Sequence, residues 1–123
     1  MRSAVEVAVD TYILASQEGD AAVRAQLLEA CFAEGGRMVT RSREIRGRAA
    51  LAAELARAHA DPKFVGIRVI SKIDAQGTTF RYRAAADFRD GPSVEAFDAG
   101  EIDESGRISL ILTFAGALGA AED

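Results

Sequence analysis

The spacing of apolar residues changes once along this chain, at Asp61-Pro62, and that change limits the folds available to it. Before this point apolar residues recur every three or four positions, which is typical of helices with one buried side. After it they alternate with polar residues, which is typical of strands with one buried face. Helices that precede strands, rather than alternating with them, predict an α+β fold.

Glycine, aspartate and proline mark the ends of the expected helices. Gly19-Asp20 ends the first helix and caps the second, Gly47 begins the third, and the residue before Pro62 is disfavoured in a helix. We therefore expect three helices over residues 3–16, 21–30 and 48–60. A short bent strand over 32–40 precedes the third helix.

Four runs rich in β-forming residues follow Pro62. The segments between them are short and contain glycine, aspartate or proline, so they are suited to hairpin turns. The runs are therefore expected to form an antiparallel meander. They cover residues 64–73, 78–89, 94–102 and 107–114.

Composition excludes several classes of function. The 123 residues carry a formal net charge of −4, without the basic excess that nucleic-acid binding requires. One cysteine, Cys31, and one histidine make a metal site unexpected, and no apolar run is long enough to span a bilayer. Glu6 interrupts any apolar signal-peptide core. We expect a single domain over 1–123 in the cytoplasm, with no cofactor, metal, nucleic acid or membrane.

Strict alternation assigns a face of the sheet to each strand residue. In the run 78–89 it places Phe80, Tyr82 and Phe88 on the inner face with small alanines. In the last run it places Ile108, Leu110, Leu112 and Phe114 on that face. The outer face then carries Ala85, Phe97, Ile111 and Thr113, an apolar patch that predicts a homodimer.

Asp98 is the exception on the inner face, because its strand neighbours on that face are Ala96 and Gly100. A carboxylate among apolar residues is costly to ionise, so its pKa is expected to be raised and the group to donate a hydrogen bond near neutral pH. The alternative is that Asp98 lies at a wet end of the strand or bonds a backbone amide.

The order of elements and three local strings resemble the nuclear-transport-factor-2-like superfamily, which includes ketosteroid isomerases and SnoaL-like polyketide cyclases. The strings are Tyr12 ahead of Gly19-Asp20, then Gly47-Arg48-Ala49-Ala50-Leu51, and last the segment 97–108, FDAGEIDESGRI. The resemblance covers nearly the whole chain. It implies a cone of helices on a strongly curved, mostly antiparallel sheet around one pocket.

Matched to ketosteroid isomerase, Tyr12 and Asp98 stand at the positions of that family's oxyanion-binding tyrosine and neutral acid. Thr40 stands where those isomerases carry an aspartate base. A threonine hydroxyl cannot relay protons near pH 7, so the resemblance predicts little Δ5-3-ketosteroid isomerase activity.

His59 lies on the inner stripe of the third expected helix and is a candidate base, or else a packed histidine. Five arginines between Arg37 and Arg48 can hold a carboxylate or phosphate of a ligand at the pocket mouth. The alternative is that they belong to a solvated loop or form salt bridges across a dimer.

Together these features predict a pocket for a small apolar molecule and, if the chain is an enzyme, enolate-type isomerisation, cyclisation or dehydration. A non-catalytic dimerisation or ligand-sensing module is the alternative. The expected catalytic residues are Tyr12, Asp98 and His59, and the expected pocket lining is Thr40, Tyr82, Phe88, Leu110, Leu112 and Phe114.

Overall fold

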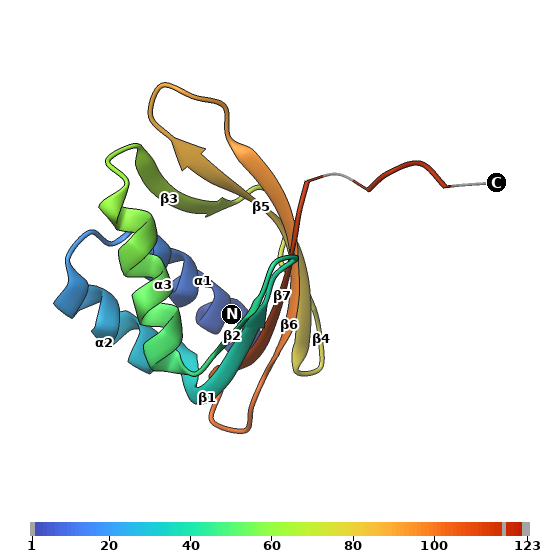
Figure 1. The fold of residues 1–123 in the computed structure, drawn as a ribbon. Helices are drawn as coiled ribbons and strands as arrows, with labels where there is room; N and C mark the ends of the chain where they lie inside the picture. Colours follow the sequence, from blue (N-terminus) through green and yellow to red (C-terminus); the bar gives the residue numbers. More distant parts are fainter. Residues whose placement is uncertain (1, 117, 122–123) are drawn as a thin grey trace.

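A computed structural model describes residues 2–116 and 118–121 of the chain and shows three helices packed on one strongly curved sheet (Figure 1). The helices lie on the concave side of the sheet. In chain order the elements are α1 (Ala4–Gln17), α2 (Ala21–Cys31), β1 (Phe32–Val39), β2 (Glu44–Arg46), α3 (Arg48–Ala60), β3 (Phe64–Val69), β4 (Asp74–Gln76), β5 (Thr79–Phe88), β6 (Val94–Ile102) and β7 (Ile108–Ala115).

The helices begin at residues that satisfy free backbone amides. Ser3 and Glu6 form a capping box at the start of α1, and the Asp20 side chain accepts hydrogen bonds from two amides at the start of α2. Gly47 precedes α3 with φ of 95°, a conformation that glycine adopts without strain. These local signals account for the close agreement between the expected and observed helices.

The sheet has the strand order β2-β1-β7-β6-β5-β3, and β4 pairs with β5 as a short hairpin. Every neighbouring pair is antiparallel except β1 and β7, which are parallel. The predicted α+β fold with a strongly curved, mostly antiparallel sheet is therefore confirmed. Strands β2 and β4 were not predicted, because each is three residues long and largely exposed, so neither shows a clear apolar alternation.

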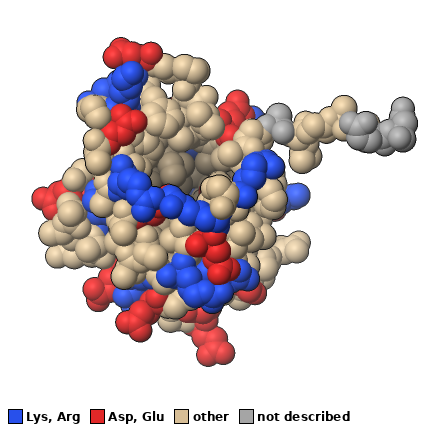
Figure 2. Space-filling model, viewed as in Figure 1, with Lys and Arg blue, Asp and Glu red and all other residues tan. Residues whose placement is uncertain are grey.

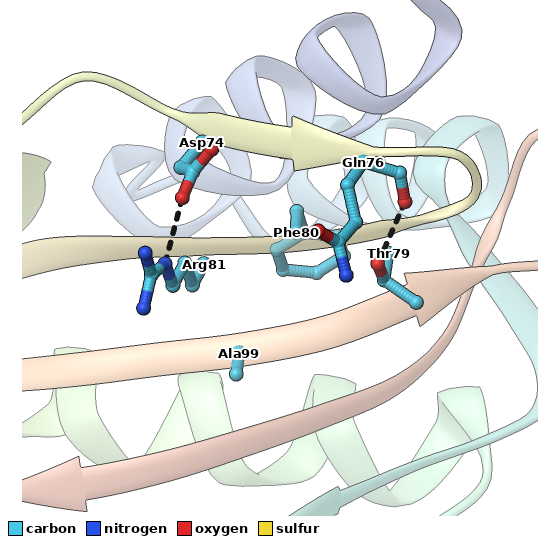
Figure 3. A pocket seen from close by; sticks show the side chains of 6 residues that line it. All are labelled: Asp74, Gln76, Thr79, Phe80, Arg81 and Ala99. Atoms are coloured by element: carbon cyan, nitrogen blue, oxygen red, sulfur yellow. Dashed lines mark hydrogen bonds and ion pairs between the residues drawn. The ribbon is translucent and has the colours of Figure 1, made fainter.

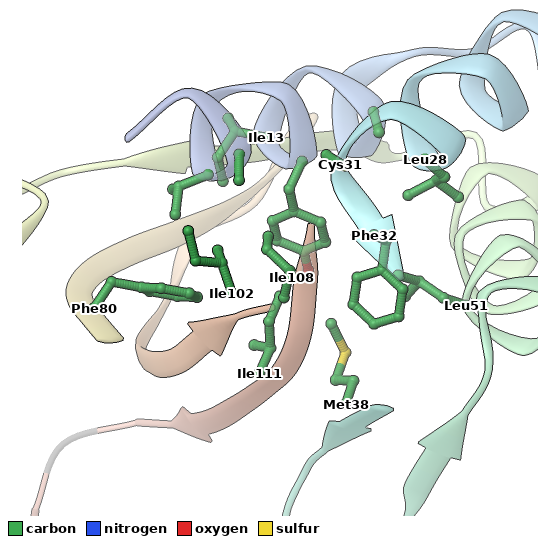
Figure 4. Close-up of a cluster of buried hydrophobic side chains, with 14 of the residues drawn as sticks. Ile13, Leu28, Cys31, Phe32, Met38, Leu51, Phe80, Ile102, Ile108 and Ile111 are labelled. Atoms are coloured by element: carbon green, nitrogen blue, oxygen red, sulfur yellow. The ribbon is translucent and has the colours of Figure 1, made fainter. Parts of the chain in front are cut away.

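The narrow end of the cone is filled by the main apolar core (Figure 4). Phe32, Ile108 and Ile111 are fully buried there, below Leu28 of α2. Gly100 allows the close packing, because a Cβ at this position would lie 2.6 Å from the Phe80 ring. This end of the cone leaves no room for a ligand.

A bulge in β7 changes which residues face the helices. Glu101 pairs with Leu110 while Ile102 pairs with Ile108, so Ser109 is an extra residue in the ladder. Ile108 keeps the inner face, but beyond the bulge the inner residues of β7 are Ile111, Thr113 and Ala115. The assignment of Leu110, Leu112 and Phe114 to the inner face, and of Ile111 and Thr113 to the outer face, was wrong.

Candidate functional site

The inner face of strands β5, β6 and β7 consists of three successive layers of paired residues. Directly opposed residues on antiparallel strands point to the same face, so each layer is read from the register. The layers are Phe80–Gly100–Ile111 at the closed end, Tyr82–Asp98–Thr113 in the middle and Ala84–Ala96–Ala115 at the open end. A polar layer thus separates a packed core from a layer of small side chains.

The middle layer brings three oxygen-bearing side chains together, and α1 adds a fourth. Tyr82 and Asp98 are 2% and 4% exposed, and Thr113 is half-buried beside them. Tyr12 of α1 is 2% exposed and is close enough to Asp98 for the carboxyl to influence its titration. We call Tyr12, Tyr82, Asp98 and Thr113 the polar layer.

Burial controls the protonation of this layer. Desolvation raises the pKa of the Asp98 carboxyl, and the neighbouring hydroxyls of Tyr82 and Thr113 offset that rise only in part. Desolvation likewise raises the pKa of Tyr12 and of Tyr82, and the nearby Asp98 carboxyl raises both further. Both tyrosines therefore keep their protons at neutral pH, and the pKa of the Asp98 carboxyl lies above that of an exposed aspartate.

Two atoms of the polar layer lack partners. Tyr82 Oη and Asp98 Oδ1 are both buried, and neither has a hydrogen bond of adequate geometry with any described group, although the Tyr82 hydroxyl lies close enough to lower the pKa of Asp98. A buried polar atom without a partner costs about 1–3 kcal/mol, so folded proteins rarely keep one without a reason. An oxygen atom of a ligand would satisfy either group.

A hollow opens between the helices and the sheet on the face shown in Figure 2. The alanine layer is the layer nearest the open end, and its side chains are small, with Ala84 buried, Ala96 half-buried and Ala115 exposed. The polar layer is the next layer toward the closed end. A molecule that entered the hollow would therefore meet small side chains first and hydroxyl and carboxyl groups at its floor.

Two further depressions lie on the outer face of the sheet. One, of about 310 Å³, is lined by Asp74, Gln76, Thr79, Phe80, Arg81 and Ala99 (Figure 3). Its polar side chains already have partners, because Arg81 pairs with Asp74 at 2.7 Å and Thr79 Oγ1 donates to Gln76 O at 2.7 Å. The other, of about 750 Å³, is bordered by exposed Phe97 and Phe114. Neither has the orphaned buried groups of the inner hollow.

Neither a scan against protein-family models nor a search of the curated proteins found a match. Among solved structures, a SnoaL-like family protein from Agrobacterium tumefaciens matches with a TM-score of 0.80 and 23% identity, over 90% of this chain and 96% of that one. An NTF2-like protein from Burkholderia xenovorans matches with a TM-score of 0.70 and 17% identity, over 97% and 88%. This chain has the nuclear-transport-factor-2-like fold. An LEH-like epoxide hydrolase from M. tuberculosis shares it, with a TM-score of 0.71 and 19% identity over 92% and 83% of the two chains.

Within this NTF2-like fold, the predicted residues Tyr12, Tyr82 and Asp98 come together in the polar layer. Their contribution to ligand binding stays a prediction. Thr113 was missed as a member, because alternation without a bulge places it on the outer face. A polar residue inside an apolar strand, Ser109, is the sequence signal that points to the bulge.

His59 and Phe88 lie near the mouth of the cone rather than in the polar layer. His59 Nε2 is 2.8 Å from the carbonyl oxygen of Ser16, and because a carbonyl only accepts, Nε2 must carry a proton. The His59 ring also packs edge-on against Phe64, which in turn packs against Phe88. His59 thus ties α3 to α1, and only its Nδ1 remains available as a base.

Thr40 lies at the turn between β1 and β2. Its hydroxyl donates to Arg43 O at 3.1 Å, and its backbone amide donates to the same oxygen at 2.9 Å. It is half-buried on the side of β1 that also carries buried Met38. Leu110, Leu112 and Phe114 do not reach the hollow, because they lie on the outer face.

Metal ligands do not gather anywhere in the described part of the chain, since no three His, Cys, Asp or Glu side chains come together there. Cys31 is buried, and desolvation raises the pKa of its thiol to about 12, which keeps it protonated. Within the same residues, no helix combines the length and the apolar character that a membrane crossing demands.

Proposed function

We propose that the inner hollow binds a small, mainly apolar molecule that carries a carbonyl or similar acceptor oxygen. The observation that supports this is the pair of buried, unpartnered groups, Tyr82 Oη and Asp98 Oδ1, below a layer of alanines. A phenol donates a hydrogen bond, and a carboxyl does so in its protonated form, which burial favours. Donors held in a dry site bind an acceptor more strongly than they would in water.

If the chain is an enzyme, these donors suit reactions in which negative charge develops on the bound oxygen. Donors that are fixed before the reaction begins stabilise an enolate without a cofactor, as in isomerisation, cyclisation or dehydration. The Agrobacterium protein is named as a candidate isomerase, which is compatible with this chemistry. The Thr40 hydroxyl is bonded within a turn, so the group proposed as the general base is His59, through its Nδ1.

The proposal is tested with two probes of one skeleton, 2-decalone and decalin, whose binding is followed by NMR chemical-shift titration. Wild type should bind the ketone about two- to twelvefold more tightly, since one hydrogen bond contributes about 0.5–1.5 kcal/mol. Asp98→Ala and Tyr82→Phe should reduce that preference while leaving decalin binding largely unchanged.

Asp74→Asn is the matched control, because Asp74 is an exposed aspartate on the outer side of the sheet, paired with Arg81. It should bind both probes as wild type does. Equal affinity of wild type for ketone and hydrocarbon, or a ketone preference that survives Asp98→Ala, would contradict the proposal.

A second candidate function, homodimerisation, is favoured by the outer face of the sheet. Phe97 and Phe114 are 39% and 53% exposed there, around the groove of about 750 Å³. Arg83 and Glu95 form an ion pair on the same face, so a two-fold copy can place the cation of one chain opposite the acid of the other. We propose this face as the contact between two copies of the chain.

A further inference from the structure

One side of the mouth of the hollow carries more positive than negative charge. Arg43 and Arg57 both contact Glu54 of α3, the latter at 2.9 Å. Arg41 has no carboxylate partner among the described residues, and its guanidinium reaches the carbonyl oxygen of Ala115 at 3.4 Å. Two guanidinium groups thus share one carboxylate and a third has none, in a chain whose net charge is −4. We call Arg41, Arg43 and Arg57 the arginine rim.

The position of the rim follows from its contacts. Arg43 joins the β1–β2 turn to α3, and Arg41 joins the same turn to the end of β7, where the alanine layer opens. Figure 2 shows a row of basic side chains along one edge of the hollow. Arg37 and Arg46 also share one acid, Glu44, but they lie on the outer side of β1 and β2.

Aromatic side chains occupy another part of the mouth. The rings of His59 and Phe64 lie 5.0 Å apart, and those of Phe64 and Phe88 lie 5.8 Å apart. All three side chains are half-buried, so they offer apolar surface at the opening. A ligand that passes between the aromatic group and the arginine rim meets apolar surface and excess positive charge together.

We propose that the ligand of the hollow is an apolar carbonyl compound with a carboxylate at its other end, and that the arginine rim binds this carboxylate. The inference rests on the proposed function, in which the polar layer binds the carbonyl oxygen. The planar guanidinium group matches the geometry of a carboxylate, and the apolar body of the ligand would occupy the alanine layer between the two polar ends.

The fold also sets the spacing between the two polar ends of the ligand. Ala115, which Arg41 contacts, lies two residues beyond Thr113 of the polar layer on β7. Two residues of a strand span roughly 7 Å, and the arginine side chains extend the distance further. A carbonyl carbon and a carboxylate carbon about 7–10 Å apart would therefore reach both groups.

The test uses 7-oxooctanoate and its methyl ester, which share a carbonyl and a chain but differ in charge. Isothermal titration calorimetry should show tighter binding of the acid than of the ester. A higher salt concentration should weaken binding of the acid but not of the ester, since exposed charges are screened. Arg41→Gln should lower the affinity for the acid about three- to tenfold and leave the affinity for the ester unchanged.

Glu54→Gln is expected to raise the affinity for the acid, a result that misfolding of the variant cannot produce. It removes the one carboxylate that competes for Arg43 and Arg57, so the acid should bind more tightly than to wild type. Arg81→Gln is the control, because Arg81 pairs with Asp74 on the outer face and should affect neither probe.

The outcomes separate the two proposals. If the ester binds and Asp98→Ala weakens it, but Arg41→Gln and Glu54→Gln leave the affinity for the acid unchanged, the arginine rim is wrong and the carbonyl site stands. If Arg41→Gln and Glu54→Gln both change the affinity for the acid while Asp98→Ala changes the affinity for neither probe, the proposed carbonyl site is wrong. Failure of both probes to bind at millimolar concentration would overturn both.

Discussion

The two faces of strands β5, β6 and β7 use the same backbone for different purposes. On the inner face the side chains change from a packed layer, through the polar layer, to alanines that open into the hollow. On the outer face, charged residues such as Arg81 and Arg83 alternate with exposed apolar ones such as Phe97. Polar side chains on the outer face are solvated, whereas those of the polar layer are buried and two of their atoms lack partners. The same alternating strand thus gives polar groups two different environments, and only the buried one makes a ligand partner worthwhile.

The largest expected effect comes from two neighbouring residues on opposite faces. Ile111→Ala should lower the free energy of unfolding by about 2–5 kcal/mol, because Ile111 is fully buried at the closed end of the cone. Leu112→Ala should cost about 1 kcal/mol or less, since Leu112 is half-buried on the outer face. Urea denaturation measures both values. Equal losses would contradict the register beyond the bulge.

A smaller effect concerns pH and the polar layer. Burial raises the pKa of folded Asp98, so between its unfolded pKa of about 3.9 and the higher folded value the folded chain holds a proton that the unfolded chain releases. Asp98 therefore contributes its full stability below the pKa of the unfolded chain. This contribution is lost as the pH rises through the pKa of the folded chain. Asp98→Asn should remove this loss of stability with rising pH.

The pH prediction is checked by denaturation of wild type and Asp98→Asn from pH 4 to pH 9. The difference in unfolding free energy between them should change in favour of the variant as the pH rises, because ionised Asp98 is buried and Asn cannot ionise. Asp74→Asn, the exposed control, should show no such trend. Parallel pH profiles for wild type and Asp98→Asn would show that Asp98 titrates as an ordinary carboxyl.

The smallest effect on folding is expected on the outer face. Phe97→Lys replaces a side chain that is already 39% exposed, so the free energy of unfolding of the monomer should change by less than about 1 kcal/mol. Its effect on assembly should be large, because it places like charges at the centre of the proposed two-fold contact. Sedimentation at tens of micromolar should show a dimer for wild type and a monomer for the variant. A wild-type monomer would remove the dimer proposal.

Much of the candidate site was predictable because its residues lie in regular elements with clear alternation. Along β5 the inner positions of Tyr82 and Phe88 follow from a strict period of two, and Asp98 on β6 is the one acid on its face. In β7 alternation favours the wholly apolar phase of the sequence ISLILTFA, which begins at Ile108, but the bulge at Ser109 reverses the phase of every later residue. The inner face of that strand was therefore assigned incorrectly beyond Ser109.

The sequence by itself determined the three helices, the long strands and the α+β class, because caps, prolines and apolar periods act over a few neighbouring residues. The curvature of the sheet was implied by the family resemblance. Only the tertiary structure decided which side chains meet across strands. The bulge at Ser109 brought Thr113 to Asp98, and the β1–β2 turn brought Arg41 to Ala115 and Arg43 to Glu54. Such contacts depend on register and on loop paths between distant segments, and no local pattern in the sequence encodes them.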